Sequence, residues 1–163
     1  MTFQSTVAST QGFGVVGEFA KDSPHRVDPY ILNSADAAYN VVGRVFIVSA
    51  EGVAAAGGTV TAGTLAGILV SPKSYVSGGT SAGGTLAPTL TLRNGEVGEL
   101  CTMGEIIVAV PASAAIGDAV KYNTTTGVIG TGSPSAGEAA LPNAYVTQLT
   151  PAAAGLAIIK ITA

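Results

Sequence analysis

The sequence has few of the residues from which catalytic and metal sites are usually built. Among 163 residues there are no tryptophans, one cysteine and one histidine, and only 10 % of the residues are charged. A metal site made of imidazole and thiolate ligands needs several such side chains in one place, so this class of site is excluded. The single cysteine, Cys101, has no partner for an intramolecular disulfide, and we expect it to be a small buried hydrophobic residue.

The remaining catalytic candidates are weak. A Ser-His-Asp arrangement could use only His25, which lies in a proline-flanked turn. Residues 12–17 match the Gly-x-Gly-x-x-Gly spacing of dinucleotide-binding loops, but no strand precedes them and no helix follows them. Calcium needs several oxygen ligands close together, and the 10 aspartates and glutamates are sparse. We therefore predict a protein that is not an enzyme and has no cofactor and no metal.

The charge and hydropathy patterns argue against two further classes of partner. The net charge is −3, and the 7 basic residues are scattered, whereas nucleic-acid binding needs basic clusters that face phosphates. The mean hydropathy is +0.49, yet no apolar run approaches about 20 residues without Gly, Pro, Ser or Thr. Residues 1–6 have neither a basic nor an apolar region, so we expect no signal peptide. The sequence thus predicts no nucleic acid and no membrane as partners.

What the sequence does contain is a series of short β-forming segments separated by glycine-rich punctuation. Residues 96–129 are expected to form two consecutive hairpins, and residues 35–39 a single helical turn capped by Asn33 or Ser34. Residues 50–64, 77–87 and 130–140 are expected to be loops of small residues, and residues 141–143 a turn. The other expected strands are 12–19, 30–32, 41–48, 65–70, 90–92, 144–149 and 156–161.

This pattern predicts an all-β fold, a single-domain β-sandwich or barrel of many short antiparallel strands with long Gly/Ala/Ser/Thr loops. Residues 1–12 are polar and small, and we expect them to be an N-terminal arm with Phe3 as a possible anchor. Residues 13–163 would then be the single β-rich domain.

One segment concentrates charge in this charge-poor chain. It is either a solvated loop or a docking loop that makes charge-paired contacts with a partner. Its candidate partner-contact residues, together with Phe3, are Lys21, Asp22, His25, Arg26 and Asp28.

Glycines and one aspartate mark the expected turns near the end of the chain. Gly117 and Asp118 precede a strand that contains Val120 and Tyr122, and Gly127 ends the connection that follows it. We expect the Asp118 carboxylate to accept hydrogen bonds from nearby backbone amides and so to set the entry of the hairpin.

At these residues the sequence resembles the structural cement (head decoration) proteins of tailed bacteriophages. The similarity begins with 117–122 and Thr126-Gly127, and it extends to residues 43–46, although Val45 here separates the arginine and phenylalanine of the family's Gly-Arg-Phe strand. Residues 66–75 and 104–108 also look like strands of this family, in the same order along the chain, so that the resemblance covers residues 13–161.

The resemblance implies a β-rich, non-catalytic protein that oligomerises on the outside of a phage head and clamps adjacent subunits of the major capsid protein. It would be synthesised in the host cytoplasm, act on the exterior of the virion, and associate with itself as a dimer or trimer. We also predict that the N-terminal arm and residues 50–64 and 77–87 carry contacts between subunits.

Two alternatives stay open: another virion component of the tail or fibre, and a carbohydrate-binding β domain or small hydrolase.

Overall fold

A computed structural model describes residues 14–61, 64, 66–71 and 91–162. Its strands confirm the all-β prediction. Within the described residues they are β1 (Arg26–Leu32), β2 (Val45–Ala50), β3 (Val53–Ala56), β4 (Ala66–Leu69), β5 (Val97–Val110), β6 (Ala119–Asn123), β7 (Ile129–Thr131), β8 (Glu138–Gln148) and β9 (Gly155–Ile161), and one 3-10 helix, η1, spans Ala37–Tyr39. No helix of the described residues is long and apolar enough to cross a membrane.

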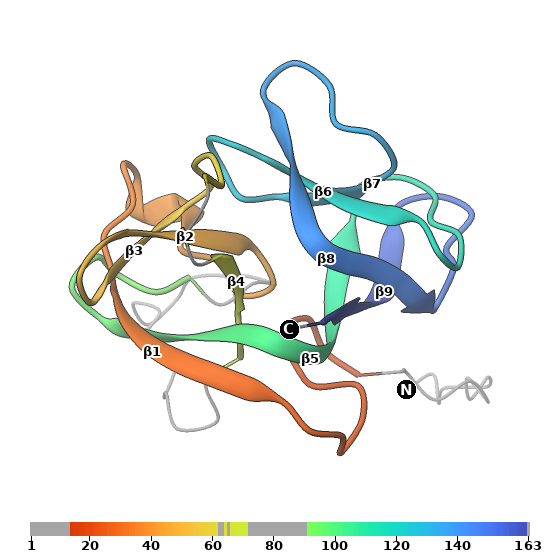
Figure 1. The fold of residues 1–163 in the computed structure, drawn as a ribbon, viewed down its shortest axis with the longest axis horizontal. Helices are drawn as coiled ribbons and strands as arrows, with labels where there is room; N and C mark the ends of the chain where they lie inside the picture. Colours follow the sequence, from red (N-terminus) through yellow and green to blue (C-terminus); the bar gives the residue numbers. More distant parts are fainter. Residues whose placement is uncertain (1–13, 62–63, 65, 72–90, 163) are drawn as a thin grey trace, which may run out of the picture.

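Five strands close into a barrel. β1 pairs with β3, β3 with β2, β2 with β4, β4 with β5, and β5 returns to β1, which completes the ring (Figure 1). All of these pairs are antiparallel except β1 with β3, which are parallel. A closed ring leaves none of these strands with an unpaired edge, and unpaired edges are where β proteins associate by accident.

The second sheet grows from the same long strand. The first half of β5 belongs to the barrel, while Gly104 to Val110 pair with β9, which is followed by β8, β6 and β7. The strand changes sheets at Gly104, whose φ is +135° and where an added β-carbon would lie 2.9 Å from the β-carbon of His25. A single strand therefore builds both halves of the molecule, as Figure 1 shows for β5.

Alternate residues of the barrel strands point into two different cores. Phe46, Leu69 and Leu100 fill the inside of the barrel, whereas their neighbours Ile68 and Cys101 join the core that the second sheet covers. Because both faces of β4 and of the first half of β2 are buried, their sequences are almost continuously apolar instead of alternating with polar residues. This explains the unbroken apolar runs at residues 45–48 and 66–70.

The turn between β6 and β7 docks on the barrel by backbone contacts. The amide of Gly58 donates to the carbonyl of Thr124, and the hydroxyl of Tyr122 donates to the carbonyl of Gly58 at 3.0 Å. Gly57 has a φ of +70°, and an added β-carbon there would lie 2.4 Å from the carbonyl oxygen of Thr124. The approach of the two backbones thus depends on a residue without a side chain.

Several local expectations were wrong. Residues 97–110 form one continuous strand instead of two, and residues 141–143 lie within β8, where Asn143 adopts a φ of +56° instead of turning the chain back. The expected loop 50–64 contains β3, and residues 14–18 form a turn before an isolated bridge at Phe19. The helical turn is present, but Asp36 caps it by accepting a hydrogen bond from the amide of Ala38.

Candidate docking surface

The segment before β1 is held against β5 by its backbone. The amide of Gly17 donates to the carbonyl of Ile107, and the amide of Ile107 donates to the carbonyl of Glu18, at 2.8 and 2.9 Å. Gly17 has a φ of +84°, and an added β-carbon would lie 2.0 Å from a methyl group of Val42. This close fit fixes residues 17–20 on the edge of β5 and positions the charged segment that follows.

Lys21 does not point freely into solvent. Its ammonium lies 2.8 Å from Glu105 Oε2, and the ammonium of Lys160 lies 3.9 Å from Glu105 Oε1. The Glu105 side chain is only 10 % exposed, so this carboxylate depends on the two lysines for neutralisation. Lys21 is therefore committed to its own chain.

Arg26 and Asp28 also interact with each other, through a buried threonine of β5. Arg26 Nε donates to Thr102 Oγ1 at 2.8 Å, Thr102 Oγ1 donates to Asp28 Oδ2 at 3.2 Å, and Arg26 Nε lies 3.7 Å from Asp28 Oδ2. Both charged side chains are more than a third exposed, so the pair adds little to stability but limits how either residue could turn toward a partner.

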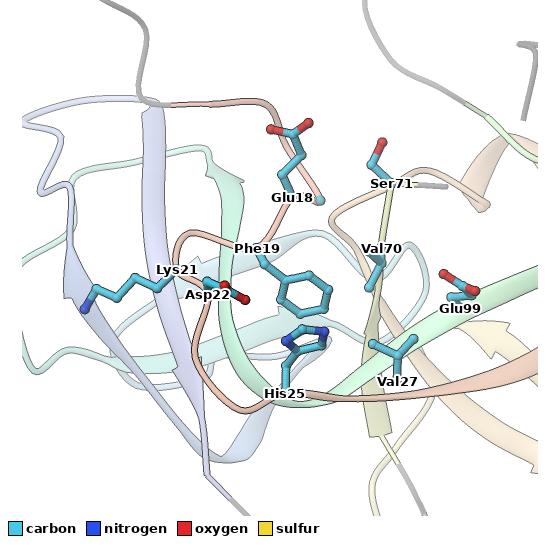
Figure 2. Close-up of a pocket in the computed structure, with 10 residues that line it drawn as sticks. Glu18, Phe19, Lys21, Asp22, His25, Val27, Val70, Ser71 and Glu99 are labelled. Carbon is cyan, nitrogen blue, oxygen red and sulfur yellow. The ribbon is translucent and has the colours of Figure 1, made fainter. Parts of the chain in front are cut away.

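His25 stacks on Phe19. The ring centroids are 4.1 Å apart with an angle of 25° between the planes, and the His25 Nδ1 lies 3.0 Å from the carbonyl oxygen of Ser23. Figure 2 shows the two rings side by side, opposite Val27 and Val70. An imidazole held in this way supplies a fixed surface, and His25 lines the pocket described next.

These residues border a pocket of about 640 Å³ between the charged segment, β4 and β5. Figure 2 shows Lys21 directed away from the aromatic pair, consistent with its ion pair to Glu105. The residues that line the pocket are Gly17, Glu18, Phe19, Lys21, Asp22, His25, Val27, Val70, Ser71 and Glu99.

The structure brings together three of the predicted contact residues, namely Lys21, Asp22 and His25. Arg26 and Asp28 lie on β1 outside the lining, and Phe3 lies outside the described residues. Sequence reasoning missed Glu18 and Glu99, which also line the pocket. Nothing in the sequence signals Glu99, because it reaches this place only through the pairing of β5 with β1, where it lies opposite Pro29.

The predicted turn residues have structural contacts of their own. Asp118 Oδ2 accepts a hydrogen bond from the amide of Ala115 at 2.8 Å, and the amide of Gly117 donates to the carbonyl of Val146. Gly127, with a φ of +70°, lies in the turn that docks on the barrel. These contacts place all three residues in the framework and away from the pocket.

Four described groups outside the pocket have a shifted pKa, and the shifts are largest for Cys101 and Glu138. Burial raises the pKa of the Cys101 thiol to about 11, which leaves it without nucleophilic character near neutral pH. Hydrogen bonds from Ser135, followed by the contact with Lys121, lower the pKa of Glu138 to about 2. Lys121 Nζ lies 2.9 Å from Glu138 Oε2, which also accepts hydrogen bonds from the Ser135 amide and hydroxyl at 2.8 and 2.6 Å.

No group of three or more His, Cys, Asp or Glu side chains that could hold a metal ion occurs among the described residues. Gly-x-Ser-x-Gly is the spacing that surrounds the nucleophilic serine of α/β-hydrolases. It occurs at residues 79–83, which lie outside the described residues.

Comparison with known proteins identifies a family and a fold. The model of the phage family described as structural cement protein (E217 gp24/Pam3 gp6) matches residues 3–162. Among solved structures, a chain from the capsid of Myoviridae phage XM1 has the same fold, with a TM-score of 0.66 and 19 % sequence identity over 99 % of this chain and 98 % of that chain. No curated protein matches the sequence.

Proposed function

The chain belongs to the family of phage structural cement proteins and has a structural role in the capsid, and we propose that it binds the outer surface of the assembled phage head. There it would bridge neighbouring subunits of the major capsid protein. The observation that carries this proposal is the match of the family model to residues 3–162, which is nearly the whole chain.

The mechanism would be thermodynamic. A protein that binds the assembled lattice but not its separated subunits stabilises the lattice, and the stabilisation grows with the logarithm of its free concentration relative to its dissociation constant. If each copy contacts two or more capsid subunits, the second contact forms at a high effective concentration and strengthens the first. The closed barrel suits this role, because its five strands leave no free edge at which copies crowded on a shell could pair by accident.

Several finer features belong to the same proposal. The protein would associate with itself as a dimer or trimer, would contact neither nucleic acid nor membrane, and would act without catalysis. The N-terminal arm and residues 50–64 and 77–87 would carry contacts between subunits. The low charge of the chain supports this arrangement, because surfaces with few charged residues are suited to burial against a partner.

The decisive experiment measures the melting of phage heads that lack this protein, with and without the purified protein. Saturating binding should raise the melting temperature of the heads, while heads mixed with an unrelated protein of similar size should melt unchanged. Binding to tails instead of heads, seen by immunogold labelling of whole virions, would contradict the proposal, as would saturation without any thermal gain. Turnover of simple esters that is lost in a Ser81→Ala variant would contradict the absence of catalysis.

A further inference from the structure

The pocket beside the charged segment has two chemically different parts. Phe19, Val27 and Val70 supply apolar surface, and Figure 2 shows Phe19 and the two valines facing one another. The carboxylates of Glu18, Asp22 and Glu99 belong to the same lining, and all three residues are exposed. A ligand that enters this pocket meets apolar walls and negative charge together.

This negative charge is not balanced from within the described part of the chain. The ammonium of Lys21 lies 2.8 Å from Glu105, and Glu105 is not part of the pocket. Glu18 accepts only a long hydrogen bond of 3.3 Å from the amide of Val15. No hydrogen bond or ion pair joins the carboxylates of Asp22 or Glu99 to any of the described residues.

We propose that this pocket binds a basic side chain, arginine or lysine, presented by a neighbouring capsid protein subunit. The inference rests on the proposed function and adds the chemistry of the contact. The methylene stem of a long basic side chain would pack on Val27, Val70 and Phe19, and its charged end would remain beside the carboxylates. A guanidinium suits such a site best, because it can donate two parallel hydrogen bonds to the two oxygens of one carboxylate.

Other kinds of occupant fit the lining poorly. A carboxylate or phosphate would meet Glu18, Asp22 and Glu99 with like charge. An apolar side chain would remove these carboxylates from water without replacing the lost hydrogen bonds, which costs free energy. Charge complementarity therefore selects a cation, and the apolar side chains in the same lining favour one that is carried on a long aliphatic stem.

The test uses the full-length protein and phage heads that lack it. Asp22→Asn and Glu99→Gln each remove one charge without changing shape, and neither side chain has a described partner whose loss would disturb the fold. Each should weaken binding to heads about threefold, and the double variant about tenfold, with a smaller dependence of affinity on salt concentration. Asp36→Asn is the matched control, because Asp36 is exposed and lies outside both the pocket lining and the predicted contact segments, and asparagine keeps the oxygen that accepts a hydrogen bond from the Ala38 amide. The affinity of this variant for heads should equal that of the wild type.

The outcomes separate this inference from the function on which it rests. Wild-type and double-variant proteins that bind heads equally well would overturn the pocket contact and leave the cement function standing. A wild-type protein that does not bind heads at all would remove both. A lower melting temperature of the isolated double variant would place the occupant in the protein's own chain, where Lys73 follows Ser71 by two positions, and would also overturn the proposal. A cryo-EM map of decorated heads should show a capsid arginine or lysine beside Glu99.

Discussion

Val45 and Gly127 meet backbone to backbone where the second sheet joins the barrel. The amide of Val45 donates to the carbonyl of Gly127 at 2.9 Å, and a β-carbon on Gly127 would lie 2.4 Å from the carbonyl oxygen of Val45. Since β-carbons do not approach oxygens this closely, any side chain at position 127 would push the β6–β7 turn away from β2.

We therefore expect Gly127→Ala to lower the free energy of unfolding by about 3 kcal/mol, through the combined cost of positive φ and the clash. Gly52→Ala is the control, because Gly52 has a φ of +71° and nothing lies within 4 Å of its added β-carbon. That variant should lose only about 1 kcal/mol. Urea unfolding of both measures the difference, and equal losses would show that the joint accommodates a side chain.

The depressed pKa of Glu138 predicts a dependence of stability on acid. Its pKa is about 2 in the folded protein against 4.5 for the free side chain, so its stabilising contribution is complete above about pH 4.5 and is lost as the pH falls through about 2. Wild type should melt above Glu138→Gln at neutral pH, and the gap between their melting temperatures should close over that acid range. A gap that stays constant down to pH 2 would show that the carboxylate is not the source of the difference.

Cys101 should be chemically silent in the folded protein. It is fully buried, and its raised pKa of about 11 leaves very little thiolate at mildly alkaline pH. A thiol reagent should label almost none of the native protein and all of it in denaturant, as measured by mass spectrometry. Rapid labelling of the native protein would mean that the core around β5 opens far more often than its packing implies.

Removal of residues 2–12 tests the N-terminal arm. We expect the truncated protein to keep the β circular dichroism spectrum of the full chain and to bind phage heads more weakly. The reason is that the described residues, none of which belongs to the arm, form two hydrophobic cores of their own, while the arm is predicted to add contacts between subunits. Equal affinity of the two proteins for heads would refute the role of the arm.

The sequence predicts an element well where its apolar pattern is compatible with a single type of secondary structure. The β6–β7 hairpin and β9 lie where the alternation and the turn residues place them. It fails at glycines and alanines, whose roles depend on distant neighbours. Gly98 suggests a break in the strand, but it lies inside β5. A glycine is required there for space, since an added β-carbon would lie 2.7 Å from Leu69 Cδ1. The alanines of β3 suggest a loop, yet Ala54 and Ala56 are buried in the narrow barrel interior.

The candidate site was only partly predictable for a related reason. Lys21, Asp22 and His25 are neighbours in sequence, so composition alone draws attention to them. That Lys21 turns to Glu105 and that Glu99 joins the pocket are consequences of strand pairing, which a local pattern does not contain. The sequence therefore shows where charge is concentrated, and the fold decides which of those charges remain available.

The passage of β5 through both sheets has a mechanical consequence. A load applied between the barrel and the second sheet runs along the covalent backbone of one strand, in addition to the docked turn at Gly57 and Gly127. Pulling the two halves apart would require shearing the ladders on either side of Gly104, and in a ladder sheared along its length many hydrogen bonds resist together. The two sheets are thus joined through the covalent backbone of one shared strand, and not only by side-chain packing between them.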